Sequence, residues 1–212
     1  MTVRDQGGLF ILCGIDGAGK STALERIAAE RPEWEVGSYD PRSWLPQPEL
    51  PHLDVLLECH PRDVLSRMEP VTGAVFLAQL VLAHYEHWLA PRLAAGAVVL
   101  LDSYHYRFHA KLAARHRAHT VFTDALLPLP RPELALLLEV DPREAARRKQ
   151  QFDEHEYFEE PEEADFVRFQ TAVWSRVREL CAADCRGTVA LDGGRAPEQV
   201  ARDVVAAIEE RS

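Results

Sequence analysis

The chain has 212 residues, of which 47% are hydrophobic and 27% charged, and its formal net charge is −10. We expect a single domain over residues 1–212, because this length can bury a sizeable core. The negative charge argues against a long nucleic-acid partner, since phosphate backbones bind to basic faces. No apolar run reaches membrane-spanning length and no signal pattern precedes the first apolar run, so we expect a cytoplasmic protein without membrane association.

The first feature along the chain is an apolar run at residues 9–13 that leads into the pattern G-x-x-x-x-G-K-[ST]. This pattern is typical of a phosphate-binding loop, in which glycines let successive N–H groups point at phosphate oxygens. Lys20 is expected to reach the β- and γ-phosphates of a nucleotide, and the Ser21 hydroxyl to ligate Mg²⁺. The following helix, at about residues 20–30, directs its positive dipole end at the same phosphates. The residues expected to bind the nucleotide are Gly14, Asp16, Gly17, Ala18, Gly19, Lys20, Ser21 and Thr22.

Short apolar runs and longer helical patterns alternate along the rest of the chain. Residues 97–101 and 134–140 are continuous apolar runs, as strands buried on both faces show. The expected strands are 9–13, 34–38, 97–101, 134–140 and 188–191, and the expected helices are 20–30, 61–68, 70–95, 104–116, one that begins at Pro142, 161–183 and 197–211. Five short strands separated by helices predict an α/β fold with a five-stranded parallel sheet and helices on both faces.

Asp102 directly follows the apolar run at 97–101. A carboxylate at the end of a buried strand beside a phosphate loop is well placed to orient Mg²⁺ or the acceptor. The alternative is an aspartate that caps the next helix, and the two roles can coexist. We therefore take Asp102 as a candidate catalytic residue and, with Ser21, as a candidate Mg²⁺ ligand.

Four basic residues, Arg143, Arg147, Arg148 and Lys149, lie within two helical turns after Pro142. Transfer of a γ-phosphoryl group needs positive charge on its oxygens, so Arg147 and Arg148 are candidate catalytic residues. The polar stretch that follows predicts a lid at about residues 143–160 that closes over the substrates. The alternative is a solvated helix face whose charges compensate one another.

These motifs resemble the thymidylate kinase family of nucleoside-monophosphate kinases, and the likeness runs almost end to end. The similar segments are 10–22, 76–80 with His84, Pro91, Leu93 and Gly96, 102–104, 141–142 with Arg147, Asp153 and Glu156, 166–168, and 191–193 with Pro197, Glu198 and Val200. The resemblance implies a P-loop kinase fold, ATP and Mg²⁺ as the donor, a nucleotide acceptor and often a homodimer through the long helices. It also implies that Asp192 lies in a loop near the adenine.

The chain departs from the family pattern where the acceptor binds. The arginine that grips the acceptor phosphate is Ser103 here, and the arginine that reads the thymine base is Leu80. A charge-assisted contact of this kind contributes roughly 1.5–3 kcal/mol. We therefore expect a rebuilt acceptor site, in which Arg42, Arg107 or Lys111 replaces the lost charge. The candidate acceptor residues are Asp16, Arg42, Phe76, Leu80, Ser103, Tyr104, Arg107 and Lys111.

The sequence thus predicts an ATP-dependent phosphotransferase whose acceptor is a nucleoside monophosphate, either thymidylate or a modified pyrimidine nucleotide. Two alternatives stay open, because the acceptor arginines are replaced. One is a nucleoside kinase with a non-phosphorylated acceptor, and the other is a kinase-like protein that binds ATP without acceptor turnover.

Overall fold

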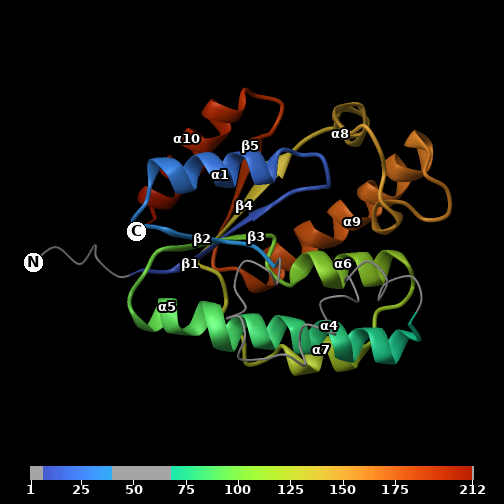
Figure 1. Ribbon diagram of the computed structural model, residues 1–212, viewed down its shortest axis with the longest axis horizontal. Helices are drawn as coiled ribbons and strands as arrows, with labels where there is room; N and C mark the ends of the chain where they lie inside the picture. The colour runs from blue at the N-terminus through green and yellow to red at the C-terminus, as the bar shows by residue number, and fades with distance from the viewer. Residues whose placement is uncertain (1–6, 40–67, 212) are drawn as a thin grey trace, which may run out of the picture.

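A parallel sheet lies between two layers of helices (Figure 1). The computed structural model describes residues 7–39 and 68–211, and in these residues five parallel strands pair in the order β2-β3-β1-β4-β5. The strands are β1 (Leu9–Cys13), β2 (Glu35–Gly37), β3 (Val99–Asp102), β4 (Leu134–Glu139) and β5 (Thr188–Asp192). This arrangement confirms the predicted fold class. The expected helix at 61–68 and Arg42 lie outside the described residues, apart from position 68.

The strand register decides what meets at the carboxyl edge of the sheet. In β1, Leu12 pairs with Asp102 of β3 on one side and with Leu136 of β4 on the other. The N–H of Ser103 donates to the carbonyl of Leu12 at 3.0 Å, which continues the pairing past the end of β3. The start of the phosphate loop and the Asp102 carboxylate are therefore neighbours.

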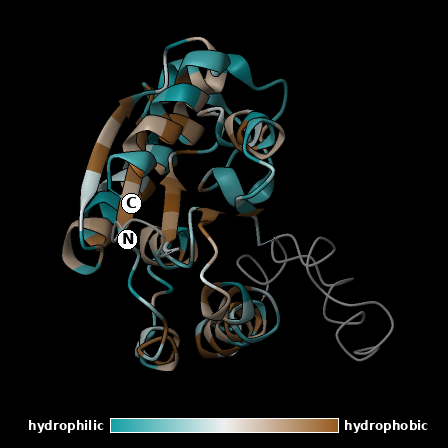
Figure 2. Cartoon of the chain, turned by 90° about the vertical axis from the view of Figure 1, so that its left-hand side faces the viewer, coloured by the Kyte–Doolittle hydropathy of each residue, from teal (hydrophilic) through white to brown (hydrophobic). Residues whose placement is uncertain are grey.

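The two faces of the sheet bury separate hydrophobic clusters, because successive side chains of a strand point to opposite faces. Leu9 and Ile11 of β1 pack on one face, and Phe10 and Leu12 on the other. The first face is covered by α4 (Pro70–His84), α6 (Tyr106–Ala114), α7 (Thr120–Ala125) and most of α9 (Glu163–Asp184), and the second by α1 (Lys20–Glu30), α8 (Pro142–Arg148) and α10 (Pro197–Glu209). Figure 2 shows the hydrophobic strands between these layers. Each large side chain buried in this way contributes about 1.5–3 kcal/mol to folding.

The helical stretch expected at 70–95 is interrupted. It consists of α4, a π-helical turn η2 (Tyr85–Leu89) and a short helix α5 (Ala90–Ala94). Pro91 lacks an N–H group, and its ring would clash with the carbonyl four residues earlier in a regular α-helix. The wider turn just before Pro91 accommodates that ring, as π-bulges do.

Helix α7 is an element that the sequence pattern did not predict. Its segment, residues 120–125, contains β-branched residues that disfavour helix. Tertiary contacts decide the conformation here, since the ring of Phe122 is buried in the first cluster. The Nδ1 atom of His119 also accepts a hydrogen bond from the N–H of Val121 and caps the helix start.

A search of residues 7–39 and 68–211 for a membrane-spanning helix finds none of sufficient length and hydrophobicity.

Candidate active site

A cavity of about 650 Å³ lies at the carboxyl ends of β1 and β3. It is lined by Asp16, Gly17, Gly19, Lys20, Ser21, Thr22, Asp102, Arg107, Arg148, Lys149, Glu156, Arg195 and Pro197. Its walls come from the phosphate loop, the end of β3, α6, the end of α8 with residues that follow it, and the segment that leads into α10. Concave sites at this edge of a parallel sheet are where ligands of α/β proteins bind.

The phosphate loop depends on glycine at two positions. Gly17 and Gly19 have φ angles of 82° and 94°, a left-handed conformation that side chains disfavour. A Cβ atom on Gly17 would also lie 2.8 Å from the carbonyl oxygen of Ala145 in α8. The Lys20 ammonium donates to the carbonyls of Gly14 and Ile15, both at 2.9 Å. Lys20 is thereby held across the loop, with its side chain at the cavity wall.

The carboxylate of Asp16 is paired inside the protein. Its Oδ2 atom accepts hydrogen bonds from Lys111 Nζ at 2.7 Å and from Gln170 Nε2 at 3.1 Å. Burial alone would raise the pKa of Asp16, but Lys111, Lys20 and Arg107 outweigh burial and hold that pKa well below its usual range. Burial lowers the pKa of Lys111, although Asp16 favours its charged form. The ammonium of Lys111, expected at the acceptor, therefore neutralises Asp16 instead of lining the large cavity.

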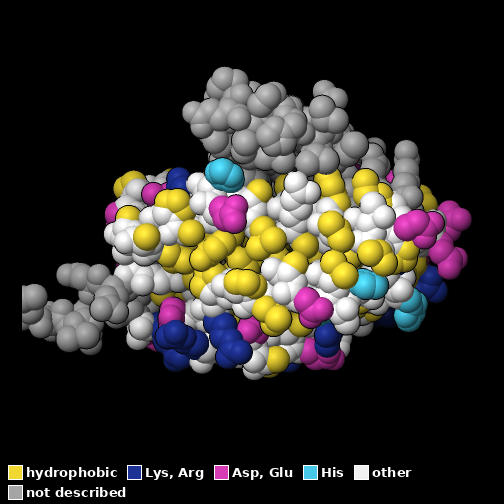
Figure 3. Space-filling view, turned by 90° about the horizontal axis from the view of Figure 1, so that it is seen from below, with side chains coloured by type: hydrophobic (Ala, Val, Ile, Leu, Met, Phe, Trp, Pro, Cys, Tyr) yellow, Lys and Arg dark blue, Asp and Glu magenta, His cyan; other side chains and the backbone are white. Residues whose placement is uncertain are grey.

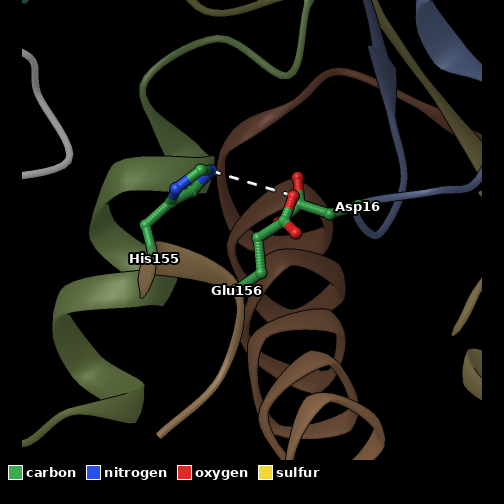
Figure 4. Close-up of side chains that lie close together, drawn as sticks. All are labelled: Asp16, His155 and Glu156. Atoms are coloured by element: carbon green, nitrogen blue, oxygen red, sulfur yellow. Dashed lines mark ion pairs between the residues drawn. The ribbon is translucent and has the colours of Figure 1, made fainter. Parts of the chain in front are cut away.

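A second carboxylate approaches Asp16 from the predicted lid. Glu156 ends a short 3₁₀ helix, η3 (Glu154–Glu156), and its side chain points toward Asp16 (Figure 4). Glu156 accepts from Lys149 Nζ at 2.9 Å and from the N–H of Asp153 at 3.0 Å. Burial and the nearby Asp16 charge raise the pKa of Glu156. Ligand atoms of Asp16, His155 and Glu156 lie within 4.8 Å of one another, but lysines already neutralise both carboxylates, so we assign no metal ion to this cluster.

Asp102 and Arg107 form the part of the cavity wall at the end of β3. Ser103 Oγ donates to Asp102 Oδ1 at 2.7 Å, and Arg107 Nη1 lies 3.6 Å from Asp102 Oδ2. Ser103 and Tyr104 have φ angles of 62° and 48°, which costs of order 1–3 kcal/mol for each residue. This left-handed pair delays the start of α6 to Tyr106, two residues after the expected start. The cation that faces the cavity here is Arg107, one helical turn beyond Ser103.

The two candidate arginines of the basic helix lie in different places. Arg148 lines the cavity, and its Nη1 atom donates to the carbonyl of Gly193 at 3.1 Å. Arg147 is 66% exposed and pairs with Glu144 at 2.7 Å. Lys149 adds another ammonium group to the cavity wall. The structure therefore brings Arg148 to the site and gives Arg147 the surroundings of a solvated face.

Several candidate acceptor residues lie behind the cavity wall. Leu80 is buried in the first hydrophobic cluster, and Phe76 packs against the same cluster. Tyr104 is also buried, and its hydroxyl donates to the carbonyl of Pro130 at 3.2 Å. These three residues are not among those that line the large cavity. Arg42 is outside the described residues.

The loop around Asp192, expected near the adenine, reaches the cavity through other residues. Asp192 ends β5, and its Oδ1 atom accepts a hydrogen bond from the N–H of Gly194 at 2.8 Å. Asp192 stabilises the turn without lining the cavity. Arg195 and Pro197, a few residues further on, do line it.

One candidate residue that sequence reasoning missed is Gln170. It is completely buried on α9, where it contacts Asp16 and the lid. Its neighbours on the buried face of α9 are the apolar residues Phe166, Phe169, Val173 and Val177. A glutamine within an otherwise apolar helix face was the signal that could have found it.

The fold and the cavity together define a P-loop phosphotransferase. A phosphate loop follows the central strand, a carboxylate ends the neighbouring strand, and basic side chains face both from across the cavity. These are the parts that phosphoryl transfer requires, because its catalysis depends on positioning and on neutralising phosphate charge.

Comparison with known proteins identifies the family. The chain is 30% identical over 203 residues to the probable thymidylate kinase of Pyrobaculum calidifontis, a match that covers 92% of this chain and 93% of the relative. The probable thymidylate kinases of Pyrobaculum aerophilum and Methanoculleus marisnigri are 28% and 27% identical, over 92% and 94% of this chain and 93% of each relative. No family model matches the chain. The chain belongs to the thymidylate kinase family and is an ATP-dependent nucleotide kinase.

Proposed function

We propose that this kinase transfers the γ-phosphoryl group of ATP to a nucleoside monophosphate, either thymidylate or a modified pyrimidine nucleotide. One observation carries the proposal. Lys20 of the phosphate loop and Arg107 of α6 line the same cavity, with the Asp102 carboxylate beside them. Such a cavity supplies one cation for the donor phosphates and another for a phosphate on the acceptor.

On the donor side, the loop N–H groups and Lys20 would bind the phosphates of ATP, and Arg195 and Pro197 would lie toward the adenine. The Ser21 hydroxyl and the Asp102 carboxylate line the same cavity, and both offer oxygen ligands, which Mg²⁺ prefers. They would hold the ion there, and bound Mg²⁺ neutralises charge on the β- and γ-phosphates. Arg148 would stabilise the charge of the transferred group.

On the acceptor side, Arg107 would bind the monophosphate in place of the arginine that Ser103 replaces. The Ser103 hydroxyl donates a hydrogen bond to Asp102, and Leu80 has no hydrogen-bonding group for a base edge. Each lost charged contact weakens binding about tenfold to hundredfold. We therefore expect thymidylate to be a poorer acceptor than a pyrimidine nucleotide that does not need those two arginines.

A coupled assay with ATP and Mg²⁺ tests the proposal against a panel of acceptors. The panel contains thymidylate, deoxyuridylate, 5-substituted deoxyuridylates, thymidine and a reaction without acceptor. Transfer to a monophosphate but not to thymidine supports the proposal, whereas transfer to thymidine alone or ATP hydrolysis alone contradicts it. A kcat/KM for thymidylate of about 10⁴ M⁻¹s⁻¹ or more would refute the expected acceptor preference.

A homodimer is part of the proposal, and so is a cytoplasmic location. Hydrophobic side chains gather on the face formed by α4 and α7 (Figure 3). Val71 and Val75 of α4 are each 47% exposed, and Leu127 is 79% exposed. A second copy of the chain would cover this face through its long helices. Light scattering of the wild type and of Val75→Glu should show a dimer that the substitution dissociates, and a wild-type monomer would contradict the dimer.

A further inference from the structure

Gln170 makes hydrogen bonds to two parts of the active site at once. Its Oε1 atom accepts from the N–H of Asp16 at 3.1 Å. Its Nε2 atom donates to Asp16 Oδ2 at 3.1 Å and to the main-chain carbonyl of Glu156 at 3.2 Å. Asp16 belongs to the phosphate loop and Glu156 to the lid. The carboxamide therefore bridges the loop and the lid from a helix that lines neither end of the large cavity.

The partners of the carboxamide determine its orientation. An N–H group faces the Oε1 atom, while a carboxylate oxygen and a carbonyl oxygen face the NH₂ group. A rotation of the carboxamide by 180° would place its NH₂ group against the N–H of Asp16. It would also place Oε1 against the oxygens of Asp16 and Glu156. Leucine has neither function, and an ionised glutamate has no donor. Among side chains of this length, glutamine matches all of these partners.

Packing alone does not require an amide at this position. Phe166, Phe169 and Val173 surround Gln170 on the buried face of α9. Burying an amide is unfavourable unless its hydrogen bonds are satisfied, and a leucine would pack against these neighbours without that cost. The contribution of Gln170 therefore lies in its bonds to Asp16 and to Glu156.

We infer that Gln170 is a positioning residue for phosphoryl transfer, which holds Asp16 and the lid in one arrangement. This inference rests on the proposed function. Lys111 already neutralises Asp16, so the amide adds a directed donor without changing the local charge. The same NH₂ group holds the lid carbonyl at Glu156, whose side chain lines the cavity. If the lid moves away from α9, the hydrogen bond between Gln170 and the Glu156 carbonyl is lost. The position of the lid is therefore coupled to the loop that binds ATP.

Two variants and one control test the inference through kinetics. Gln170→Leu removes every hydrogen bond of the amide, and we expect kcat to fall about tenfold to hundredfold, because small displacements of reacting groups have effects of this size. The KM for ATP should change by less than about threefold, since Gln170 does not line the ATP cavity. The control is Ser175→Ala, which changes an exposed serine on α9 itself and should keep the wild-type constants.

Gln170→Glu adds a second measurement, the pH dependence of kcat, which would not change if Gln170 had only a structural role. The groups around position 170 are Asp16 from the loop, Lys111 and Arg107 from α6, and His155 and Glu156 from η3. A protonated Glu at position 170 can still donate one hydrogen bond, whereas the ionised form opposes Asp16 and the Glu156 carbonyl. We expect kcat of this variant to fall as pH rises, relative to the wild type.

Hydrogen–deuterium exchange without substrates gives an answer independent of turnover. Peptides that cover residues 14–19 and 153–157 should exchange faster in Gln170→Leu than in the wild type, or in Gln170→Glu at high pH if the leucine variant does not fold. Unchanged exchange and unchanged kcat in a folded variant would overturn the inference, even with a lower melting temperature. A wild type that phosphorylates no acceptor would overturn the proposed function, and exchange would then decide the role of Gln170 by itself.

Discussion

The two ends of the cavity are built in different ways. The phosphate end comes from one continuous segment, residues 14–22, whose shape depends on glycine φ angles and on the start of α1. The opposite end combines Asp102, Arg107, Arg148 and Glu156, which lie on separate elements. The phosphate end is thus specified by local sequence, whereas the opposite end exists only after distant parts of the chain have packed together.

This difference has a functional meaning. A contiguous loop can be carried unchanged from one kinase to another, because neighbouring residues supply its geometry. A composite wall can change one residue at a time, because its residues lie on separate elements. We therefore expect substitutions in the loop to affect transfer to every acceptor, and substitutions in the opposite wall to affect particular steps or acceptors.

The largest effect is expected from Lys20→Ala at the phosphate end. Lys20 would meet charge that grows in the transition state, so kcat should fall by about a hundredfold or more with every acceptor. Arg26→Ala serves as the control, because Arg26 lies on the same helix but pairs with Glu198 at the surface. Near-normal turnover by Lys20→Ala would show that the loop is not the donor site.

Arg148→Ala and Arg147→Ala compare two adjacent residues of the opposite wall. Arg148 lines the cavity and Arg147 is exposed, so Arg148→Ala should lower kcat about tenfold to hundredfold and Arg147→Ala by less than about twofold. Steady-state kinetics at saturating ATP measure both. A larger effect for Arg147 would mean that the lid rearranges and brings that residue to the phosphate.

Arg107→Ala should act on the acceptor more than on ATP. Removing a charged contact to a phosphate should raise the acceptor KM about tenfold to hundredfold, with a smaller change in the KM for ATP. Arg107→Lys keeps the charge and should recover part of the loss. Equal changes in the KM for the acceptor and the KM for ATP would mean that Arg107 also contacts ATP. They would contradict the division of the cavity into a phosphate end and an acceptor end.

Acid should destabilise the protein through His84. Burial lowers the pKa of this fully buried histidine from 6.5 to about 4. The unfolded chain takes up a proton below about pH 6.5 that the folded state refuses, so the free energy of unfolding should decrease as pH falls from 6.5 to 4. The contribution of His84 to the loss between pH 7 and pH 5 is expected to be about 1–2 kcal/mol.

Urea unfolding at pH 7 and pH 5 measures this loss. His84→Phe should reduce it, because phenylalanine can keep the stacked contact with Trp88, whose ring centre lies 5.2 Å from that of His84. His87→Phe changes an exposed histidine of the next turn and should leave the pH dependence as in the wild type. The same slope in both variants would assign the acid sensitivity to another group.

Much of the fold was predictable because its signals are local. Buried strands such as β3 and β4 appear as continuous apolar runs, and α1 begins at Lys20 as the loop motif requires. The π-helical turn before Pro91 and the helix around Phe122 were not predictable, because tertiary packing decides them. The left-handed conformation of Ser103 also has no signal in its own sequence.

The candidate site divides along the same line. The motif identified the loop residues and Asp102, and the structure places Asp102 and all of the loop residues except Gly14 and Ala18 around one cavity. An apolar helix face with one glutamine could have pointed to Gln170, but the partners of Gln170 and the inward direction of Lys111 depend on how α6 and α9 pack. The assigned roles of these residues stay predictions until the variants are measured.

The position of β1 in the sheet has a consequence for synthesis. Its partners β3 and β4 and the Gln170 contact lie far along the chain, with residues 16 and 170 separated by 154 positions. At about 5–20 residues per second, a ribosome needs roughly 8–30 s to make that stretch. The phosphate loop is therefore synthesised early, but its contacts form only after residue 170 has been made. Until then the apolar strand β1 has neither of its pairing strands. Chaperone dependence and slow refolding are the expected signs of such non-local pairing.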